Sequence, residues 1–292
     1  MTSGTPEQSV GGAAGRGRPY GYNSPVVQDS YIPREAASQA AFFLPHLRPG
    51  MTLLDCGCGP GTITLGLAEA VSPGEVVGID LEPGMVKLAN GFARERDVTN
   101  VRFEVADIGE LPFQDDSFDA VFTCAVLEHL AEPGDALQEI CRVLRPGGVI
   151  GVHKTDWGEP LITPPSESMK QFFQLFERGF KHHGGSLNRG RHLRVLLRQS
   201  GFDVTEFSAS YSNSATPEEV RDVVESYIGW IENLPLFDEA LELGWIDRPT
   251  LDTMKAGMAE WSTNPDAFLA TGRCEAIGWK RVSEDAEAGQ PR

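Results

Sequence analysis

Short apolar runs alternate with segments of helical periodicity through the first half of the chain. The runs are "MTLLDCG", "EVVGID", "VRFEVAD", "FDAVFTCAV" and "GVIGVHKTD". Between them, residues 83–96 and 137–144 carry apolar side chains three and four positions apart, which predicts helices. Strands this apolar are typical of a parallel sheet that is covered on both faces. The pattern therefore predicts an α/β fold with a doubly wound sheet.

The second half of the chain keeps this pattern only in part. Two more apolar runs, "FDVTEFSASYS" and "CEAIGWKR", bring the expected sheet to seven strands. The segments at about 157–187 and 212–272 are instead helical in periodicity and rich in aromatic residues, so we expect two insertions that cap the sheet. Five rings in these segments could line an apolar pocket or pack within the added helices: Phe172, Phe173, Phe176, Trp230 and Trp245.

The first 30 residues differ from the rest of the chain. They are rich in Gly, Ser and Pro and show no apolar periodicity, which predicts a flexible arm over residues 1–30. Tyr20 and Tyr22 lie in this arm and Tyr31 follows it, so either the arm could close over a site or these rings could be ordinary surface packing. We expect residues 31–292 to form one domain, with the two insertions as additions to it.

Charge and composition narrow the range of partners. The 292 residues include 25 basic and 42 acidic side chains, and the net charge of −17 disfavours nucleic acids and anionic membrane surfaces. No apolar stretch reaches the roughly 20 residues that a bilayer span needs, and the N-terminus lacks the layout of a secretory signal. The five cysteines are scattered and odd in number, which is typical of a reducing compartment. We therefore expect a soluble, cytoplasmic protein.

Glycines fill the turn between the first predicted strand and the next helix, in "LLDCGCGPGTITLGLA", residues 53–68. In a doubly wound sheet, ligands bind beyond the carboxyl ends of the strands. Gly57, Gly59 and Gly61 remove side chains from this turn, so backbone N–H groups and the helix N-terminus can approach a ligand closely. Asp55 ends the strand just before them.

Several ligands are compatible with this turn at first. A metal site would need a second pair of ligands, and apart from His182 and His183 the chain offers none at suitable spacing. The two loop cysteines also lack the Cys-x-x-Cys spacing of a redox pair. A dinucleotide pattern is incomplete, because Thr62 stands where G-x-G-x-x-G has its last glycine. Asp80, at the end of the second strand, suits ribose hydroxyls. Asp107, at the end of the third, favours an adenine amine and thus an adenosyl ligand.

The chain resembles the class I S-adenosylmethionine-dependent methyltransferases in four motifs that occur in order: "LLDCGCGPG", "VVGIDLEPGMV", "VRFEVADIGELPFQDDSFDAVFTCAVLEHL" and "EICRVLRPGGVI". The resemblance covers residues 50–155 and is closest to the small-molecule branch that includes the ubiquinone and menaquinone C-methyltransferases. It implies a Rossmann-like, mostly parallel seven-stranded sheet, S-adenosylmethionine as cofactor and a small-molecule acceptor.

The resemblance also implies roles for individual residues. It implies a cofactor site made of Asp55, Gly57, Cys58, Gly59, Gly61, Asp80, Leu81, Met85, Asp107, Ile108, Cys124, Ala125 and His129. The glycine turn and Asp55 would hold the methionine end, Asp80 the ribose, and Asp107 the edge of the adenine. Cys124 and Ala125, at the end of the fourth strand, would pass near the sulfonium.

Some of these residues also have a simpler explanation. Met85 and Ile108 could be core residues, and His129 could support the site without taking part in the reaction. A general base is optional, because holding nucleophile, methyl carbon and sulfur in line can contribute roughly 7 to 11 kcal/mol, against roughly 3 to 5 kcal/mol from a base. If a base is used, our candidate catalytic residue is His153, which we expect with Lys154 at the carboxyl end of the fifth strand. His182 and His183 in the first insertion are alternative candidates.

We therefore predict an enzyme that moves a methyl group onto a medium-sized, largely apolar or aromatic metabolite, such as a secondary-metabolite scaffold or a quinone precursor. Two other classes stay open: a nicotinamide-dependent oxidoreductase, and a protein that binds the cofactor without transferring its methyl group. The sequence also leaves open whether carbon, nitrogen or oxygen is methylated, and whether the chain forms a homodimer.

Overall fold

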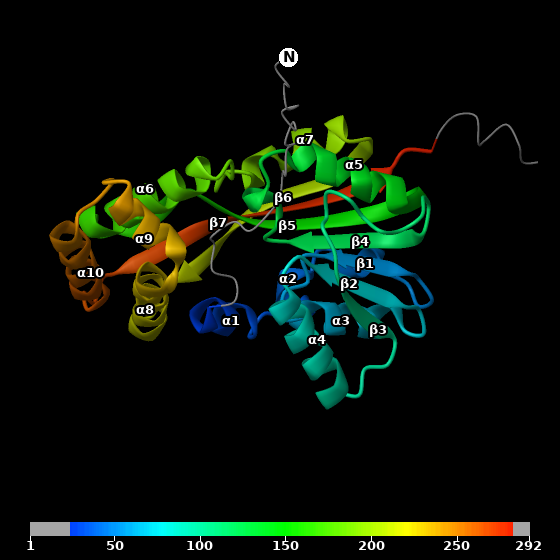
Figure 1. The fold of residues 1–292 in the computed structure, drawn as a ribbon, viewed down its shortest axis with the longest axis horizontal. Helices are drawn as coiled ribbons and strands as arrows, with labels where there is room; N and C mark the ends of the chain where they lie inside the picture. Colours follow the sequence, from blue (N-terminus) through cyan, green and yellow to red (C-terminus); the bar gives the residue numbers. More distant parts are fainter. Residues whose placement is uncertain (1–23, 283–292) are drawn as a thin grey trace, which may run out of the picture.

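In residues 24–282, which the computed structural model describes, the central sheet has seven strands in the order β3-β2-β1-β4-β5-β7-β6 (Figure 1). Neighbouring strands are parallel except that β7 runs antiparallel to β5 and β6. The predicted fold class, a mostly parallel seven-stranded α/β sheet, is confirmed. The strands are β1 (Leu53–Cys56), β2 (Val76–Asp80), β3 (Val101–Val105), β4 (Phe118–Cys124), β5 (Leu144–Thr163), β6 (Phe202–Ser214) and β7 (Phe268–Lys280).

The order of the strands reverses beside β1, and this point positions the site. β1 pairs with β2 on one side and with β4 on the other. The connections on the two sides of β1 therefore diverge, and they leave a crevice at its carboxyl end. Parallel pairing of Cys56 with Ile79 and with Thr123 brings the ends of these three strands to one edge of the sheet. All four residues of β1 are buried, because helices cover both faces of the sheet.

Two groups of helices form these covers. Figure 1 shows α3 and α4 on one side of the sheet, and α5 and α7 on the other. On the first side, the ring of Phe43 stacks on that of Phe122 in β4, with 5.5 Å between centroids. On the second side, Leu137 of α5 and Leu197 of α7 are fully buried. The helices that cover the sheet are α2 (Ala36–Gln39), α3 (Thr62–Val71), α4 (Pro83–Glu95), α5 (Pro133–Val143) and α7 (Leu193–Gln199), with short 3-10 turns at Leu44–His46, Leu127–His129 and Gly190–His192.

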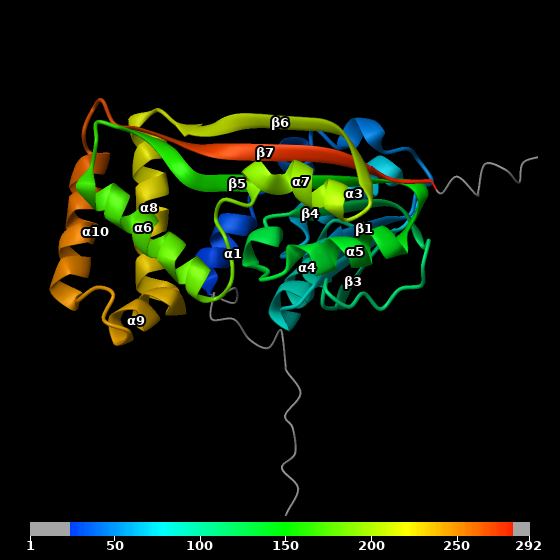
Figure 2. The same ribbon diagram turned by 90° about the horizontal axis from the view of Figure 1, so that it is seen from above.

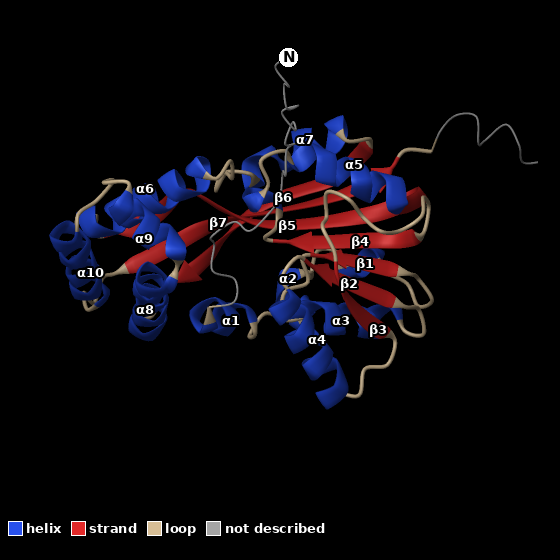
Figure 3. Ribbon diagram, viewed as in Figure 1, coloured by secondary structure: helices blue, strands red, loops and turns tan. Residues whose placement is uncertain are grey.

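Strands β5, β6 and β7 run on past the other four and carry a helical cap (Figures 1 and 3). The cap consists of α6 (Glu167–His182), α8 (Pro217–Asn233), α9 (Pro235–Glu242) and α10 (Arg248–Ser262). These helices lie within the two predicted insertions. The strands also reach into the predicted insertions, since β5 ends only at Thr163, β6 at Ser214, and β7 begins at Phe268.

The aromatic rings of the cap form the cap's own core. The ring of Phe172 stacks on that of Tyr227 at 4.8 Å, and the ring of Phe176 stacks on that of Trp230 at 5.7 Å. Phe172, Phe173 and Phe176 are all buried on the apolar face of α6. The structure therefore favours the packing alternative for these rings over a role as pocket lining.

The end of the predicted N-terminal arm is helical. Residues 1–23 lie outside the described residues, and Tyr20 and Tyr22 are among them. The following helix, α1 (Pro25–Tyr31), contacts α8 of the cap, and Figure 1 shows it beneath the extended strands, between cap and sheet. Tyr31 packs against the cap core from this helix.

Candidate functional site

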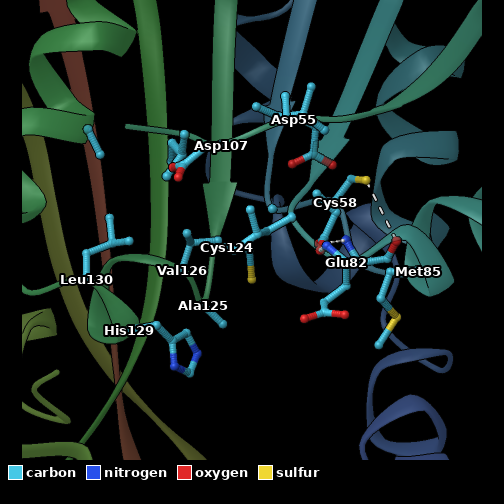
Figure 4. A pocket seen from close by; sticks show the side chains of 18 of the residues that line it. Asp55, Cys58, Glu82, Met85, Asp107, Cys124, Ala125, Val126, His129 and Leu130 are labelled. Atoms are coloured by element: carbon cyan, nitrogen blue, oxygen red, sulfur yellow. Dashed lines mark hydrogen bonds between the residues drawn. The ribbon is translucent and has the colours of Figure 1, made fainter. Parts of the chain in front are cut away.

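A cavity of about 640 Å³ opens at the carboxyl ends of β1, β2 and β4. This volume is typical of a pocket for a small molecule or cofactor. Its walls come from the glycine turn after β1, the segments after β2 and β3, and the segment between β4 and α5. Figure 4 shows side chains from these segments around the cavity, with Cys124, Ala125 and His129 across from Cys58 and Met85.

The glycine turn has a backbone that only glycine adopts easily. Gly57, Gly59 and Gly61 have φ values of 77°, 53° and 81°. A Cβ on Gly57 would overlap the side chain of Val126, and one on Gly61 would lie 2.7 Å from Cβ of Ala89. A Cβ on Gly59 would meet nothing within 4 Å, because this residue faces the cavity. At Gly57 and Gly61, glycine thus allows close packing of neighbouring side chains, and at Gly59 it leaves the backbone exposed to the cavity.

Asp80 fixes the position of this turn. Its Oδ2 accepts a hydrogen bond from the backbone N–H of Gly59 at 2.8 Å, and its Oδ1 accepts one from Glu82 at 2.9 Å. Burial raises the pKa of Asp80, although these two backbone N–H groups oppose the shift. The carboxylate therefore joins the end of β2 to the turn after β1, and it can also accept from hydroxyls of a ligand.

Asp55 is more deeply buried than Asp80, with 2% of its surface exposed. Its Oδ2 accepts a hydrogen bond of 2.6 Å from the hydroxyl of Thr64 in α3. Burial raises the pKa of Asp55 to about 7; the hydrogen bond from Thr64 opposes this shift, and the negative charge of Asp80 adds to it. A cationic ligand group at this position would stabilise the ionised form.

The adenine side of the predicted site combines apolar and polar groups. Leu81 is 51% exposed on the cavity wall, whereas Met85 and Ile108 are buried behind it. The carboxylate of Asp107 accepts a hydrogen bond from the backbone N–H of Gly109 at 2.8 Å. An exposed leucine on a concave wall, beside a carboxylate held by the backbone, can contact a flat ring on its face and on its edge.

The structure brings most of the predicted cofactor residues together. The cavity is lined by Asp55, Gly57, Cys58, Gly59, Asp80, Leu81, Met85, Asp107, Ile108, Cys124, Ala125 and His129. Gly61 is the exception, because it lies under the turn, where Ala89 and Phe103 pack against it. That these residues bind the cofactor stays a prediction.

His153 does not lie where the sequence predicted it. β5 continues ten residues beyond it, so His153 is in mid-strand, paired in register with Cys124 and Glu275, and is not at the carboxyl end. It is 5% exposed, and its Nδ1 lies 3.0 Å from Sγ of Cys124, behind the cavity wall. Burial, together with the charge of Arg273, lowers the pKa of His153 to about 3. It is therefore neutral and a weak base near pH 7.

A buried ion pair lies close behind the same wall. Nζ of Lys154 lies 2.8 Å from Oε1 of Glu128, and the side chains are 1% and 6% exposed. Burial alone would raise the pKa of Glu128, but the charge of Lys154 lowers it below its ordinary value. The pair ties β5 to the segment after β4, which also carries His129.

Two further wall residues lie outside the predicted cofactor site: Tyr31 was expected only near an arm that could close over a site, and Arg34 was not predicted. Tyr31, at the end of α1, and Arg34 line the cavity from the N-terminal side. The Arg34 guanidinium lies 4.3 Å from the centroid of the Tyr31 ring. Among the described residues that line the cavity, Arg34 is the single lysine or arginine, and Asp55, Asp80 and Asp107 are among several acids. The tyrosines at the edge of the predicted arm are a weak sequence signal for this side of the cavity.

Two absences hold for the described part of the chain. In residues 24–282, no cluster of three or more His, Cys, Asp and Glu side chains has the arrangement of a metal site. None of the helices in the same range combines the length and apolar character that crossing a bilayer requires.

Comparison with known proteins shows which sequences and folds this chain is similar to. The profile of a family described as "Methyltransferase domain" matches residues 47–196. A relative from Aspergillus luteorubrus named "Probable methyltransferase ltbC" is 29% identical over 279 residues, which are 89% of this chain and 96% of that protein. The demethylmenaquinone methyltransferase of Lactiplantibacillus plantarum is 31% identical over 176 residues, with 56% of this chain and 74% of that protein covered. The crystal structure of the YcgJ protein from Bacillus subtilis superposes with a TM-score of 0.59 at 20% identity, over 85% of this chain and 100% of its own, which shows a shared fold.

Proposed function

Since the chain belongs to the methyltransferase-domain family and is a class I S-adenosylmethionine-dependent methyltransferase, we propose that it methylates a medium-sized, largely apolar or aromatic metabolite. A secondary-metabolite scaffold or a quinone precursor has this chemistry. One observation carries the proposal: the cavity joins the glycine turn, with its bare backbone at Gly59, to the end of β4 at Cys124 and Ala125.

The wall chemistry fits S-adenosylmethionine. Asp80 would accept hydrogen bonds from the ribose hydroxyls, and Asp107 would accept from the adenine amine. Leu81 would cover a face of the adenine, which would bury the apolar surface that Leu81 now exposes. When bound, this cofactor supplies a sulfonium-activated methyl group.

The amino-acid end of the cofactor carries two opposite charges, and the cavity offers a partner for each. Asp55 would pair with the ammonium group, which would hold the Asp55 carboxylate ionised. Arg34 would pair with the carboxylate, because it is the cation on a described wall that is otherwise acidic. Tyr31, stacked against Arg34, would keep water from that end.

The residues near the transfer point favour positioning over proton transfer. Burial raises the pKa of Cys124 to about 12, so this thiol stays protonated and does not compete as a nucleophile. His153 is neutral and faces Cys124. Orientation of the acceptor and exclusion of water are therefore the main contributions that we assign to the chain.

Apolar wall residues and relatives support the acceptor class. Val126, Leu130 and Ala131 form an apolar stretch of the wall beyond Ala125. The similar proteins named above include a demethylmenaquinone methyltransferase and a fungal methyltransferase. All five cysteines are free thiols, which supports action in a reducing compartment such as the cytoplasm.

The test uses the full chain in two steps. Calorimetry with S-adenosylmethionine, and with NAD as the control, measures which cofactor binds. Incubation with S-adenosylmethionine and a panel of phenols and quinols, followed by mass spectrometry, then measures the gain of one CH₂ unit. We expect binding of the first cofactor alone and methylation of at least one aromatic acceptor. Binding without methylation of any aromatic acceptor, while a polar metabolite is methylated, would refute the acceptor class.

A further inference from the structure

Within residues 24–282, strand β6 leaves one edge of the sheet without a further strand. It pairs with β7 on one side and is the last strand in the sheet order. In Figure 2, β6 runs along the rim of the molecule, and no labelled element lies beyond it. From position 205 to position 213 every side chain of β6 is exposed. The edge is thus a long row of backbone donors and acceptors that face outward.

The protection that such an edge usually has is confined to the start of β6, where a bulge lies between Val204 and Glu206 and Glu206 is charged. Natural proteins block edge strands with charged side chains, prolines or bulges, because an open edge pairs with another chain. β3, at the opposite edge of the same sheet, is only five residues long and carries the charged pair Arg102 and Glu104. By contrast, residues 207–216, which are the rest of β6 and the two residues after it, contain no charged residue and no proline. The two edges of this sheet are therefore not equivalent.

Two exposed aromatic residues mark one face of β6. Phe207 is 39% exposed and Tyr211 is 53% exposed. They are four positions apart on a strand, so they point to the same face, with Ala209 halfway between them. The three side chains form an apolar row that is symmetric about Ala209.

We propose that β6 is the interface of a homodimer in which two copies of β6 pair antiparallel across a two-fold axis at Ala209. In this register each Phe207 lies opposite Tyr211 of the partner subunit, which gives two identical aromatic cross-strand pairs. A shift of the register by two residues in either direction would break both pairs. The interface is isologous, as a two-fold dimer requires, and it joins two sheets into one.

Charge also favours a second copy at this edge. The chain has a net charge of −17, so two copies repel over most of their surfaces. In the proposed register the nearest acid, Glu206, lies opposite Ser212 of the partner subunit and meets no like charge. Glu206 is moreover already within 3.2 Å of the His46 ring nitrogen in its own subunit. The uncharged part of β6, residues 207–214, is thus a region of the sheet where the copies can approach.

A single cysteine tests both the interface and the register. Two copies of position 209 would lie about 4.5 to 5.5 Å apart between Cα atoms, a distance at which a disulfide forms. Mild oxidation of the full-length Ala209→Cys variant should therefore give a covalent dimer. Ser212→Cys is the matched control, because its two copies would lie about 20 Å apart. Cross-linking of Ser212→Cys in preference to Ala209→Cys would overturn the proposed register.

Sedimentation of the reduced proteins gives an independent readout. We expect the natural chain to be dimeric at micromolar concentration, and Phe207→Asp to raise the dimer dissociation constant by about tenfold or more. Leu243→Asp, at an equally exposed apolar position in the cap, should leave the dimer intact. A monomeric natural chain, or a Phe207→Asp variant that dimerises as tightly as Leu243→Asp, would overturn the proposal.

Discussion

Replacing Arg34 by glutamine tests how the charged end of the cofactor is held. Arg34 is the described cation on the cavity wall, and its charge acts on the pKa of Cys124 at the end of β4 and on that of His153, which pairs with Cys124 from β5. A hydrogen bond between charged groups contributes about 1.5 to 3 kcal/mol. Loss of this bond should raise the dissociation constant of S-adenosylhomocysteine about 10- to 150-fold.

The assay is calorimetry with two ligands that differ at this end. S-adenosylhomocysteine carries the carboxylate, whereas methylthioadenosine has the same adenosine and no amino-acid group. Arg34→Gln should weaken the first ligand and leave the second unchanged. Arg178→Gln, which removes an exposed cation stacked on Trp245 of the cap, is the control for a general charge effect. Equal weakening of both ligands, or of neither, would refute the assignment of Arg34 to the carboxylate.

Three further predictions follow from burial and backbone geometry. The affinity for S-adenosylmethionine should rise with pH as Asp55 ionises around its pKa of about 7, because only the carboxylate pairs with the ammonium group. In calorimetry, Asp55→Asn should remove this pH dependence. Gly57→Ala should lower the free energy of unfolding by about 1 to 3 kcal/mol, since φ is positive and the new Cβ overlaps a side chain. Gly91→Ala is the control: its Cβ has free space on α4, and it should raise the free energy of unfolding by about 0.5 to 1 kcal/mol. Glu128→Gln should lower the free energy of unfolding by about 3 to 5 kcal/mol, because buried Lys154 loses its counter-charge. In the natural chain the contribution of this pair should fall as the pH falls through the lowered pKa of Glu128.

Each of these predictions has a result that contradicts it. A cofactor affinity that falls as the pH rises would contradict the role of Asp55. Chemical denaturation measures the free energy of unfolding for the glycine and the Glu128 variants. Equal effects of alanine at Gly57 and at Gly91 would contradict the steric argument. Removing both members of the buried pair, as in Glu128→Leu with Lys154→Met, should cost less than Glu128→Gln alone. A larger cost would show that the charges themselves stabilise the fold.

The strand-end residues could be predicted because their positions depend on local periodicity. Asp55, Asp80 and Asp107 each follow an apolar run, and parallel strands bring their carboxyl ends to one edge whatever the rest of the fold does. The glycine turn is equally local, because a positive φ is a property of the residue and its neighbours. This part of the site was therefore visible in the sequence.

The remaining features depend on contacts between distant segments. The apolar run around His153 gives no sign that β5 continues to Thr163, because that extension is stabilised by pairing with β7. The ring spacing in α6 indicates an apolar face but not which helices cover it. Arg34 lies between α1 and α2, and its place at the cavity depends on the packing of α1 against α8 and of α2 against α3, which involves segments distant in the sequence.

The sharing of strands between cap and sheet limits how the enzyme can admit its ligands. β7 passes from beneath the cap to the far end of the sheet without a break, and β5 and β6 flank it over almost the whole distance. A hinge between the two parts would have to bend three hydrogen-bonded strands at once. The cap is therefore held rigidly to the sheet, and an opening of the cavity would have to come from wall segments outside the sheet, such as α1 with Tyr31.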